Sequence, residues 1–456
     1  MLIRGKFAGN RQPFLCLPPL TFRENPRMLN LILLRFFEPE NMSTFETSAS
    51  LQPVPAAPRP RRQRMKWLAL FVLATTATGA YGGYRVWINM RINAYATSCR
   101  EAMHKKDWPR VSELASAWSK LAPQQADPWI CLAAAAGDRG EFPQAVEFLG
   151  HLPDGDPKTP MALLERSGMH FNVLNRPIEG AADCDRALRL QPHLAEAHQR
   201  LIFFYAFTMQ RARMAKQIRA ALQNDCDLPE TYIYLLGRDW MSFANATQEN
   251  VKWLRSDPDN ELYLVAAAMF AVGALALDEL SEPEKENLPR ANSPLHQRYL
   301  AELFERFPHN MELLVYYLKQ ASNDGDDDRV TALLALAPPE AVDDNRFWRF
   351  KGWLHAVRNE LDEAESAYRK ALEIHPYDYV AQHQLAAVAR RLQKFDEVEA
   401  LEARARTGNA LRREILPLPD VRKVPKELQI RIATYAASCG DDLAARKLLN
   451  RSENLP

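Results

Sequence analysis

The clearest hydrophobic pattern in the chain lies in residues 345–378, NRFWRFKGWLHAVRNELDEAESAYRKALEIHPYD. Apolar and small residues recur there at helical spacing in two blocks that a polar turn separates. Pro376 ends the second block because proline lacks a backbone N–H and clashes with the preceding turn. Small residues that let two helices cross closely alternate with large ones that fill the space beside them: Gly352, Ala364 and Ala371 against Trp348 and Tyr368. The pattern predicts a helix–turn–helix unit.

Weaker copies of this unit follow residue 92. They are 126–159 with Trp129, Leu132, Ala133 and Ala145; 161–194 with Gly168, Phe171, Ala187 and Pro192; 195–228 with Leu201, Tyr205 and Ala221; and 227–260 with Ala246 and Pro258. One unit cannot bury its own apolar face, so several must stack. We expect helical repeats over 92–260, degenerate helical repeats over 261–342, two further repeats over 345–412, and a helix pair over 425–456 that caps the stack.

The strong unit resembles the tetratricopeptide repeat (TPR), whose pattern is W-x2-L-G-x2-Y…A-x3-F…P over about 34 residues. Two positions depart from it, because Lys351 replaces the Leu before the glycine and His355 replaces the Tyr. The resemblance implies an all-α fold, a right-handed superhelix of helix–turn–helix repeats whose first helices line a concave groove. We expect this TPR-type α-solenoid to stand behind a single N-terminal transmembrane helix.

The stretch before the repeats predicts that helix. Residues 1–66 are interpreted as a disordered or partly untranslated segment with a basic linker, and Met42 and Met65 are alternative starts. Trp67 to Tyr84 then carries no charge over 18 residues, so we expect a membrane span over 67–88. A cleaved signal peptide and a buried soluble helix are the alternatives. The basic residues before Trp67 favour a cytoplasmic N-terminus and repeats outside the cytoplasm, in a bacterial envelope.

A second apolar run, LYLVAAAMFAVGALAL at 262–277, has two interpretations. It is short and rich in alanine, which favours a helix buried in the solenoid over a second membrane span. The acidic segment 278–294 after it is expected to be an insertion that leaves the solenoid. The acidic run 323–328 lacks the spacing of a calcium-binding loop, so we interpret it as a solvated turn between helices.

Composition adds few constraints on chemistry. The net charge of +1 over 456 residues gives no basic field for nucleic acid. The sequence contains no HExxH, GxxxxGK[ST], GxSxG or GxGxxG motif, so we expect no enzymatic activity, metal, cofactor or small-molecule substrate. The six cysteines form no CxxC and are expected to be free thiols, with a bridge between Cys99 and Cys131 as the alternative.

The resemblance also implies which residues face the groove. The candidates are Arg346, Arg349, Trp353, Phe203, Phe207, His383, Arg390 and Arg391. Arginine beside tryptophan suits a peptide with acidic and apolar residues, whereas solvated arginines and core phenylalanines are the simpler interpretation. Family members that bind chaperone tails carry Lys and Asn where this chain has Arg349 and Trp353, which disfavours that role.

The sequence therefore predicts a non-enzymatic, membrane-anchored TPR scaffold that binds partner proteins or peptides in its groove. The alternatives are an accessory subunit or divergent member of a TPR-bearing enzyme family, such as a protein glycosyltransferase, and a purely structural envelope protein. Neither the partner nor the oligomeric state follows from the sequence, because repeat scaffolds serve many partners.

Overall fold

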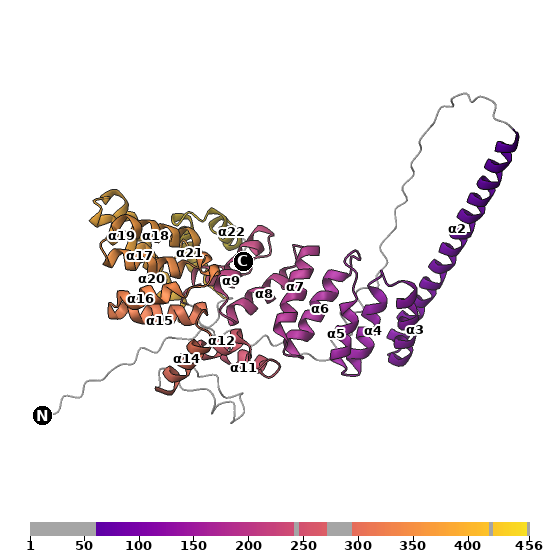
Figure 1. Ribbon diagram of the computed structural model, residues 1–456, viewed down its shortest axis with the longest axis horizontal. Helices are drawn as coiled ribbons and strands as arrows, with labels where there is room; N and C mark the ends of the chain where they lie inside the picture. The colour runs from indigo at the N-terminus through magenta and orange to yellow at the C-terminus, as the bar shows by residue number, and fades with distance from the viewer. Residues whose placement is uncertain (1–60, 241–245, 271–293, 419–422, 454–456) are drawn as a thin grey trace. The chain divides into compact units, whose positions relative to one another are not determined.

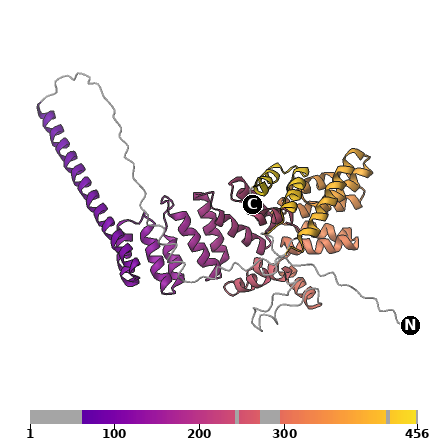
Figure 2. The ribbon, with the colours of Figure 1, turned by 180° about the vertical axis from the view of Figure 1, so that it is seen from behind.

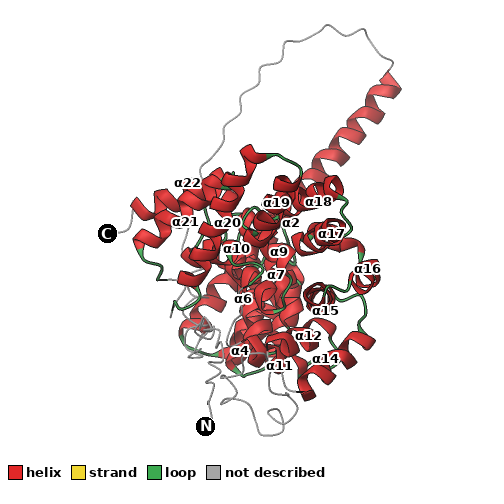
Figure 3. Cartoon of the chain, turned by 90° about the vertical axis from the view of Figure 1, so that its left-hand side faces the viewer, coloured by secondary structure: helices red, strands yellow, loops and turns green. Residues whose placement is uncertain are grey.

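A computed structural model describes residues 61–240, 246–270, 294–418 and 423–453. Within these ranges the chain is helical, and they contain no β-strand (Figure 3). The predictions for residues 1–60, for 271–277 and for the insertion up to Ser293 lie outside the described residues. The chain divides into two compact units, of which one includes residues 22–169 and the other residues 170–456.

The helices follow one another with short connections (Figure 1). The first unit holds α2 (Arg61–His104), α3 (Trp108–Leu121), α4 (Asp127–Asp138) and α5 (Phe142–Gly150), and α6 (Thr159–Asn172) crosses the boundary. The second unit holds α7 (Pro177–Leu190), α8 (Ala195–Phe207), α9 (Arg211–Gln223), α10 (Pro229–Leu236), α11 (Ala246–Leu254), α12 (Glu261–Phe270), α14 (Pro294–Arg306), α15 (Met311–Asp324), α16 (Asp327–Ala335), the 3-10 helix η4 (Pro339–Asp343), α17 (Asn345–Val357), α18 (Leu361–Ile374), α19 (Tyr379–Arg391), α20 (Phe395–Ile415), α21 (Lys426–Ser438) and α22 (Asp442–Glu453).

A left-handed backbone position recurs between paired helices and sets the repeat length. In one series it falls at Lys106, Gly140, Asn175 and Met209, and in another at Gly325, Asn359 and Gln393, so successive positions are 34 or 35 residues apart. At six of these seven positions, the next residue donates its backbone N–H to a carbonyl five residues back, at 2.8–2.9 Å. This is the Schellman arrangement that ends a helix. The structure therefore repeats every 34 or 35 residues, and the predicted TPR-type α-solenoid is confirmed as a fold.

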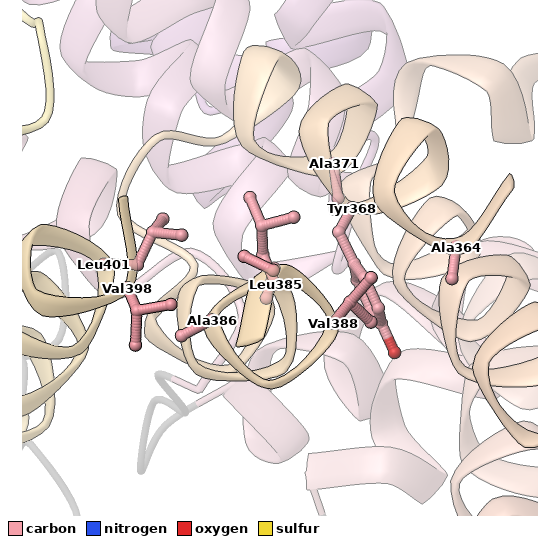
Figure 4. Close-up of a cluster of buried hydrophobic side chains, with 10 residues drawn as sticks. Ala364, Tyr368, Ala371, Leu385, Ala386, Val388, Val398 and Leu401 are labelled. Carbon is pink, nitrogen blue, oxygen red and sulfur yellow. The ribbon is translucent and has the colours of Figure 1, made fainter. Parts of the chain in front are cut away.

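The strong repeat packs as its pattern predicts. A Cβ atom added to Gly352 would lie 2.7 Å from Tyr368 Cε1, so only glycine lets α17 and α18 approach this closely. The Tyr368 ring is 2% exposed, and beside it lie Ala364 and Ala371, both completely buried. Figure 4 shows how side chains of α19 and α20 continue this core. The consecutive helices α17 to α20 lie side by side in both views of the ribbon (Figures 1 and 2).

The predicted transmembrane segment, 67–88, lies inside α2. Of the helices that the structure describes, none is both long enough and apolar enough to cross a membrane, which corrects the prediction of a transmembrane helix. The reason lies in the second half of the segment, where threonines and glycines dilute the apolar run. Thr75 and Thr78 donate their hydroxyl groups to carbonyls of the preceding turn, at Phe71 and Ala74. Leu73 and Tyr81 are 70% and 63% exposed on this helix.

The second apolar run begins as a buried helix. The described part of that run, up to Phe270, forms most of α12, where Tyr263, Val265 and Ala268 are almost completely buried. His296, at the start of α14, lies with a ring nitrogen 2.9 Å from the Ala268 carbonyl oxygen. The interpretation of a helix buried in the solenoid therefore holds for residues 262–270.

The C-terminal helices of the second unit reach back to α9 and the loop after it. Arg219 lies 2.5 Å from Asp441, and Arg451 lies 3.3 Å from Asp227. Lys447 forms a third ion pair, with Asp225. We call these three ion pairs the α9–α22 clasp. The clasp joins residues that are more than 200 positions apart, so the solenoid of this unit contacts itself in addition to its nearest neighbours.

Candidate functional site

The second unit contains a cavity of about 470 Å³, which is lined mainly by the first helix of each of three successive repeats. We call it the inner cavity. Its lining comes from α15, α17 and the start of α19, with Arg211, Asp239, Trp240 and Met269 from earlier in the chain and Arg412 from α20. Successive turns of α17 contribute Arg346, Arg349, Phe350 and Trp353, because residues three and four apart share one helix face.

A buried ion-pair network forms one wall of the inner cavity. Arg346 is 3% exposed and donates to Glu312 at 2.5 Å and 2.9 Å, and to Asp344 at 2.7 Å. The guanidinium of Arg211 at the start of α9 donates to the same Glu312 carboxylate at 3.3 Å. Burial by itself would raise the pKa of Glu312, but Arg346 and Arg211 outweigh it and lower that pKa. Glu312 is therefore an ionised bridge between α9 and α17.

A second network joins α17 to the residues around Asp239. Arg349 donates to Asp378 at 2.8 Å, and its Nη1 lies 3.5 Å from Asp239 Oδ2. Asn345 donates its amide to the same two carboxylates, at 2.8 Å and 2.6 Å. Asp378 also caps α19 by accepting from the backbone N–H groups of Val380 and Ala381. Asp239 thus pairs with Arg349 from within the chain, as a carboxylate of a bound molecule would do in its place.

Nearby charges outweigh the effect of burial on the pKa of Asp239, but not on the pKa of His375. Burial would raise the pKa of Asp239, but His375, Arg349 and Arg238 nearby hold it well below the usual range. His375 is 2% exposed, and burial lowers its pKa to about 4 although Asp239 and Asp378 favour its charged form. At neutral pH, Asp239 is therefore ionised and His375 is neutral.

The remaining lining residues are aromatic or cationic. Trp353, Tyr316 and Tyr379 are only partly buried, and Arg412 lies 6.0 Å above the ring of Trp240. Lys319 on α15 is exposed at the edge of the cavity. Five side chains of the lining are cationic (Arg211, Lys319, Arg346, Arg349 and Arg412), and three are carboxylates (Asp239, Glu312 and Asp378). The lining therefore carries a net positive charge and offers aromatic faces.

The structure distributes the eight groove candidates over different environments. Arg346, Arg349 and Trp353 line the inner cavity together. Phe203 and Phe207 on α8 are 8% and 4% exposed and pack in the core, where Phe203 meets the Tyr234 ring at 6.2 Å. The other three are exposed on α19 and lie outside the cavity lining: His383, Arg390, which pairs with Glu402, and Arg391, which donates to the Ala356 carbonyl and to Asn359.

Other residues of the cavity escaped the sequence analysis. Arg211, Asp239 and Trp240 lie more than 100 positions before α17, and no helical period links them to it. Glu312 and Lys319 sit on the first helix of a degenerate repeat, so a search of first-helix positions in the 309–342 pair finds them. That the α9–α10 region lies at the wall of the cavity is apparent only from the three-dimensional structure.

No metal site is assembled in the part of the chain that the structure describes. There, no group of three or more His, Cys, Asp or Glu side chains is placed to hold a metal ion. The acidic run 323–328 contains the turn between α15 and α16, in which Gly325 is left-handed and Asp326 caps α16. The absence of enzymatic activity stays a prediction.

Comparisons with known proteins describe the fold alone. No family model matches the chain, and no curated protein matches it. Among solved structures, it is similar to a tetratricopeptide repeat protein from Parabacteroides merdae (13% identity over 66% of this chain and 99% of that chain, TM-score 0.23). It is also similar to the Cut9–Hcn1 hetero-tetramer of APC/C (13%, 80% and 72%, TM-score 0.28) and to yeast Tom70 (15%, 80% and 77%, TM-score 0.24). TM-scores this low carry no argument about function.

Proposed function

We propose that this TPR-type solenoid is a non-enzymatic scaffold that binds a partner through the inner cavity of residues 170–456, and that the partner segment is a peptide with acidic and apolar side chains. One observation carries the proposal, namely the lining of the inner cavity. TPR-type folds generally mediate protein interactions, and the cavity supplies a place for a short segment to bind.

The charge of the lining supports an acidic ligand. Glu312 and Asp378 are saturated by arginines of the chain itself, so their charges are balanced within the wall. Glu312 and Asp378 do not neutralise the other two cations of the lining, Lys319 and Arg412. A carboxylate of a bound peptide would complement the charge of these two side chains. A basic peptide would be repelled by these two cations, and it would not be attracted by carboxylates that are already paired with arginines.

The aromatic residues support an apolar contribution from the same peptide. Trp353, Tyr316 and Tyr379 present partly exposed faces to the cavity, and residues of this kind dominate binding energy at interfaces. A volume of about 470 Å³ accommodates a few side chains and excludes a folded domain. The binding mode that fits is therefore an extended or helical segment that inserts one or two anchors.

Selection of peptides from a random displayed library on the purified full chain tests the proposal. We expect the enriched sequences to combine Asp or Glu with aromatic residues. Synthetic peptides from this set should bind wild-type protein in fluorescence titrations, lose roughly thirtyfold in affinity to Trp353→Ala, and lose about tenfold to Lys319→Glu.

Lys351→Glu is the matched control for the charge reversal. Lys351 also projects from α17, but its Nζ lies 4.3 Å above the Trp348 ring and outside the cavity lining. Its reversal should leave the affinity unchanged. Enrichment without acidic residues, or equal losses for Lys319→Glu and Lys351→Glu, would contradict the proposal and favour a purely structural role.

A location in a bacterial envelope, with the repeats outside the cytoplasm, remains part of the proposal. Its support is the charge-free stretch that follows the basic residues before Trp67, a layout that is also typical of an export signal. A tag at the C-terminus should be removed by protease added to spheroplasts. Protection of the tag until the cells are lysed would contradict this location.

A further inference from the structure

Two cysteines from different helices meet in the unit of residues 22–169. Cys99 lies near the end of α2 and Cys131 lies in the middle of α4. Both side chains are completely buried thiols, and Cys99 lies one helical turn before Met103 on α2, so the two residues share one face of that helix. Cys131 also lies 3.8 Å from the Met103 sulfur. The helices α2 and α4 contact each other directly as well as through α3.

The pair is electrostatically asymmetric. The neighbouring Cys131 thiol is the largest cause that lowers the pKa of Cys99; burial opposes it and the charge of Arg110 adds to it. The neighbouring Cys99 thiol, followed by burial, raises the pKa of Cys131 well above its usual value. Cys99 is therefore the thiol of the pair that ionises more readily.

We propose that Cys99 and Cys131 are a disulfide-forming pair that fastens α2 covalently to α4. The inference is independent of the inner cavity, because all of its residues lie in the other compact unit. Met103 fills the remaining space beside Cys131 and has no thiol to exchange. Cys99 and Cys131 are the only cysteines in the sequence of residues 22–169, so neither has another thiol of the same unit to pair with.

The chemistry needs a disulfide as the oxidant. The thiolate of Cys99 attacks one sulfur of a small disulfide, such as glutathione disulfide, and one thiolate leaves. Cys131 then loses its proton and attacks Sγ of Cys99, which releases the second thiolate. Two protein thiols become one disulfide, and the oxidant becomes two thiols that take up the two protons.

Burial decides when this exchange occurs. A completely buried thiol does not meet an oxidant in the folded unit, so exchange takes place during folding or when α2 parts from α4. Once formed, the bond closes the loop of residues 100–130 and restricts the unfolded chain. The helix α2 then cannot separate from α4 without reduction.

Refolding of the full chain tests the proposal without any substitution. The protein is unfolded under reducing conditions and refolded in a buffer of reduced and oxidised glutathione. Free thiols are then blocked with N-ethylmaleimide, and peptides are mapped by mass spectrometry. We expect one dominant internal disulfide, with the peptide of Cys99 joined to that of Cys131 and a mass lower by two hydrogen atoms. The thermal midpoint should rise by at least about 5 °C over reduced protein.

Three variants separate the pair from general oxidation. Cys99→Ser and Cys131→Ser should each lose the linked peptide and the rise in the midpoint, whereas Cys226→Ser, which changes a buried cysteine of the other unit, should keep both. Wild-type protein that refolds to its native helicity with Cys99 and Cys131 both blocked would overturn the proposal. Pairing of Cys99 mainly with another cysteine would overturn it equally.

Discussion

Gly352 and Tyr368 are in contact so close that an added Cβ on Gly352 would lie 2.7 Å from the tyrosine ring. The ring sits in a packed core, between α17 and α18, and cannot move away without disturbing its neighbours (Figure 4). We predict that Gly352→Ala lowers the free energy of unfolding by about 1–3 kcal/mol, because overpacking forces the helices apart. Chemical denaturation of the full chain measures the change.

The double variant Gly352→Ala with Tyr368→Leu provides the control for this contact. Leucine is shorter than tyrosine and leaves room for the added methyl group. The alanine substitution should therefore cost at least about 1 kcal/mol less in the Tyr368→Leu background than in wild type. Equal costs in both backgrounds would show that the effect comes from elsewhere.

A glycine substitution at one of the left-handed turn positions should stabilise the protein. Gln393 has a φ of 62° and is exposed, so its side chain gains little contact for the strain of this conformation. Gln393→Gly should raise the free energy of unfolding by about 0.5–1 kcal/mol. Ala387→Gly, at an exposed site inside α19, should lower it by a similar amount. The prediction is wrong if both glycine substitutions destabilise the protein.

Asp378 ties two parts of the second unit together. It holds Arg349 and Asn345 and caps α19, and it is 3% exposed. Asp378→Ala should cost roughly 3–5 kcal/mol of stability, because it leaves the largely buried Arg349 without its closest carboxylate. Asp378→Asn should cost less, since the amide oxygen still caps the helix. Equal effects of the two substitutions would show that the cap contributes nothing and that loss of the ion pair to Arg349 accounts for the whole cost.

His375 predicts a dependence of stability on pH. Burial lowers its pKa in the folded state to about 4, from 6.5 in the unfolded chain. The unfolded state therefore binds the proton more readily, and stability falls as the pH drops from 6.5 towards 4, by about 3 kcal/mol at most. His375→Asn should flatten the curve in this window. The pKa of Asp239 is held well below its usual range, so its contribution is lost only in more acidic solution.

The local pattern was enough to predict the repeats but not the site. The contact between Gly352 and Tyr368 and the helix stop at Pro376 follow from spacing within one unit, so they could be predicted. Burial of Phe203 agrees with the simpler interpretation of a core phenylalanine, but its partner could not be predicted, because Tyr234 lies on a later helix, α10. A transmembrane helix was wrongly predicted because the absence of charge over 67–84 was given more weight than its threonines and glycines.

The inner cavity shows the same limit more sharply. Arg349 lines the inner cavity, but its partner Asp239 lies 110 positions earlier. Repeat spacing says nothing about which distant segment meets that face. The net charge of the lining therefore could not be predicted, because it depends on how many arginines are neutralised from within.

The α9–α22 clasp changes how the second unit should unfold. In an open solenoid each repeat contacts only its neighbours, so the ends fray independently and loss of the last repeat leaves distant ones unaffected. Here Asp227 and Arg451, 224 positions apart, belong to one cooperative unit. Removal of α21 and α22 should therefore speed hydrogen exchange in α9 and α10, and folding must wait for contacts between opposite ends of the chain segment.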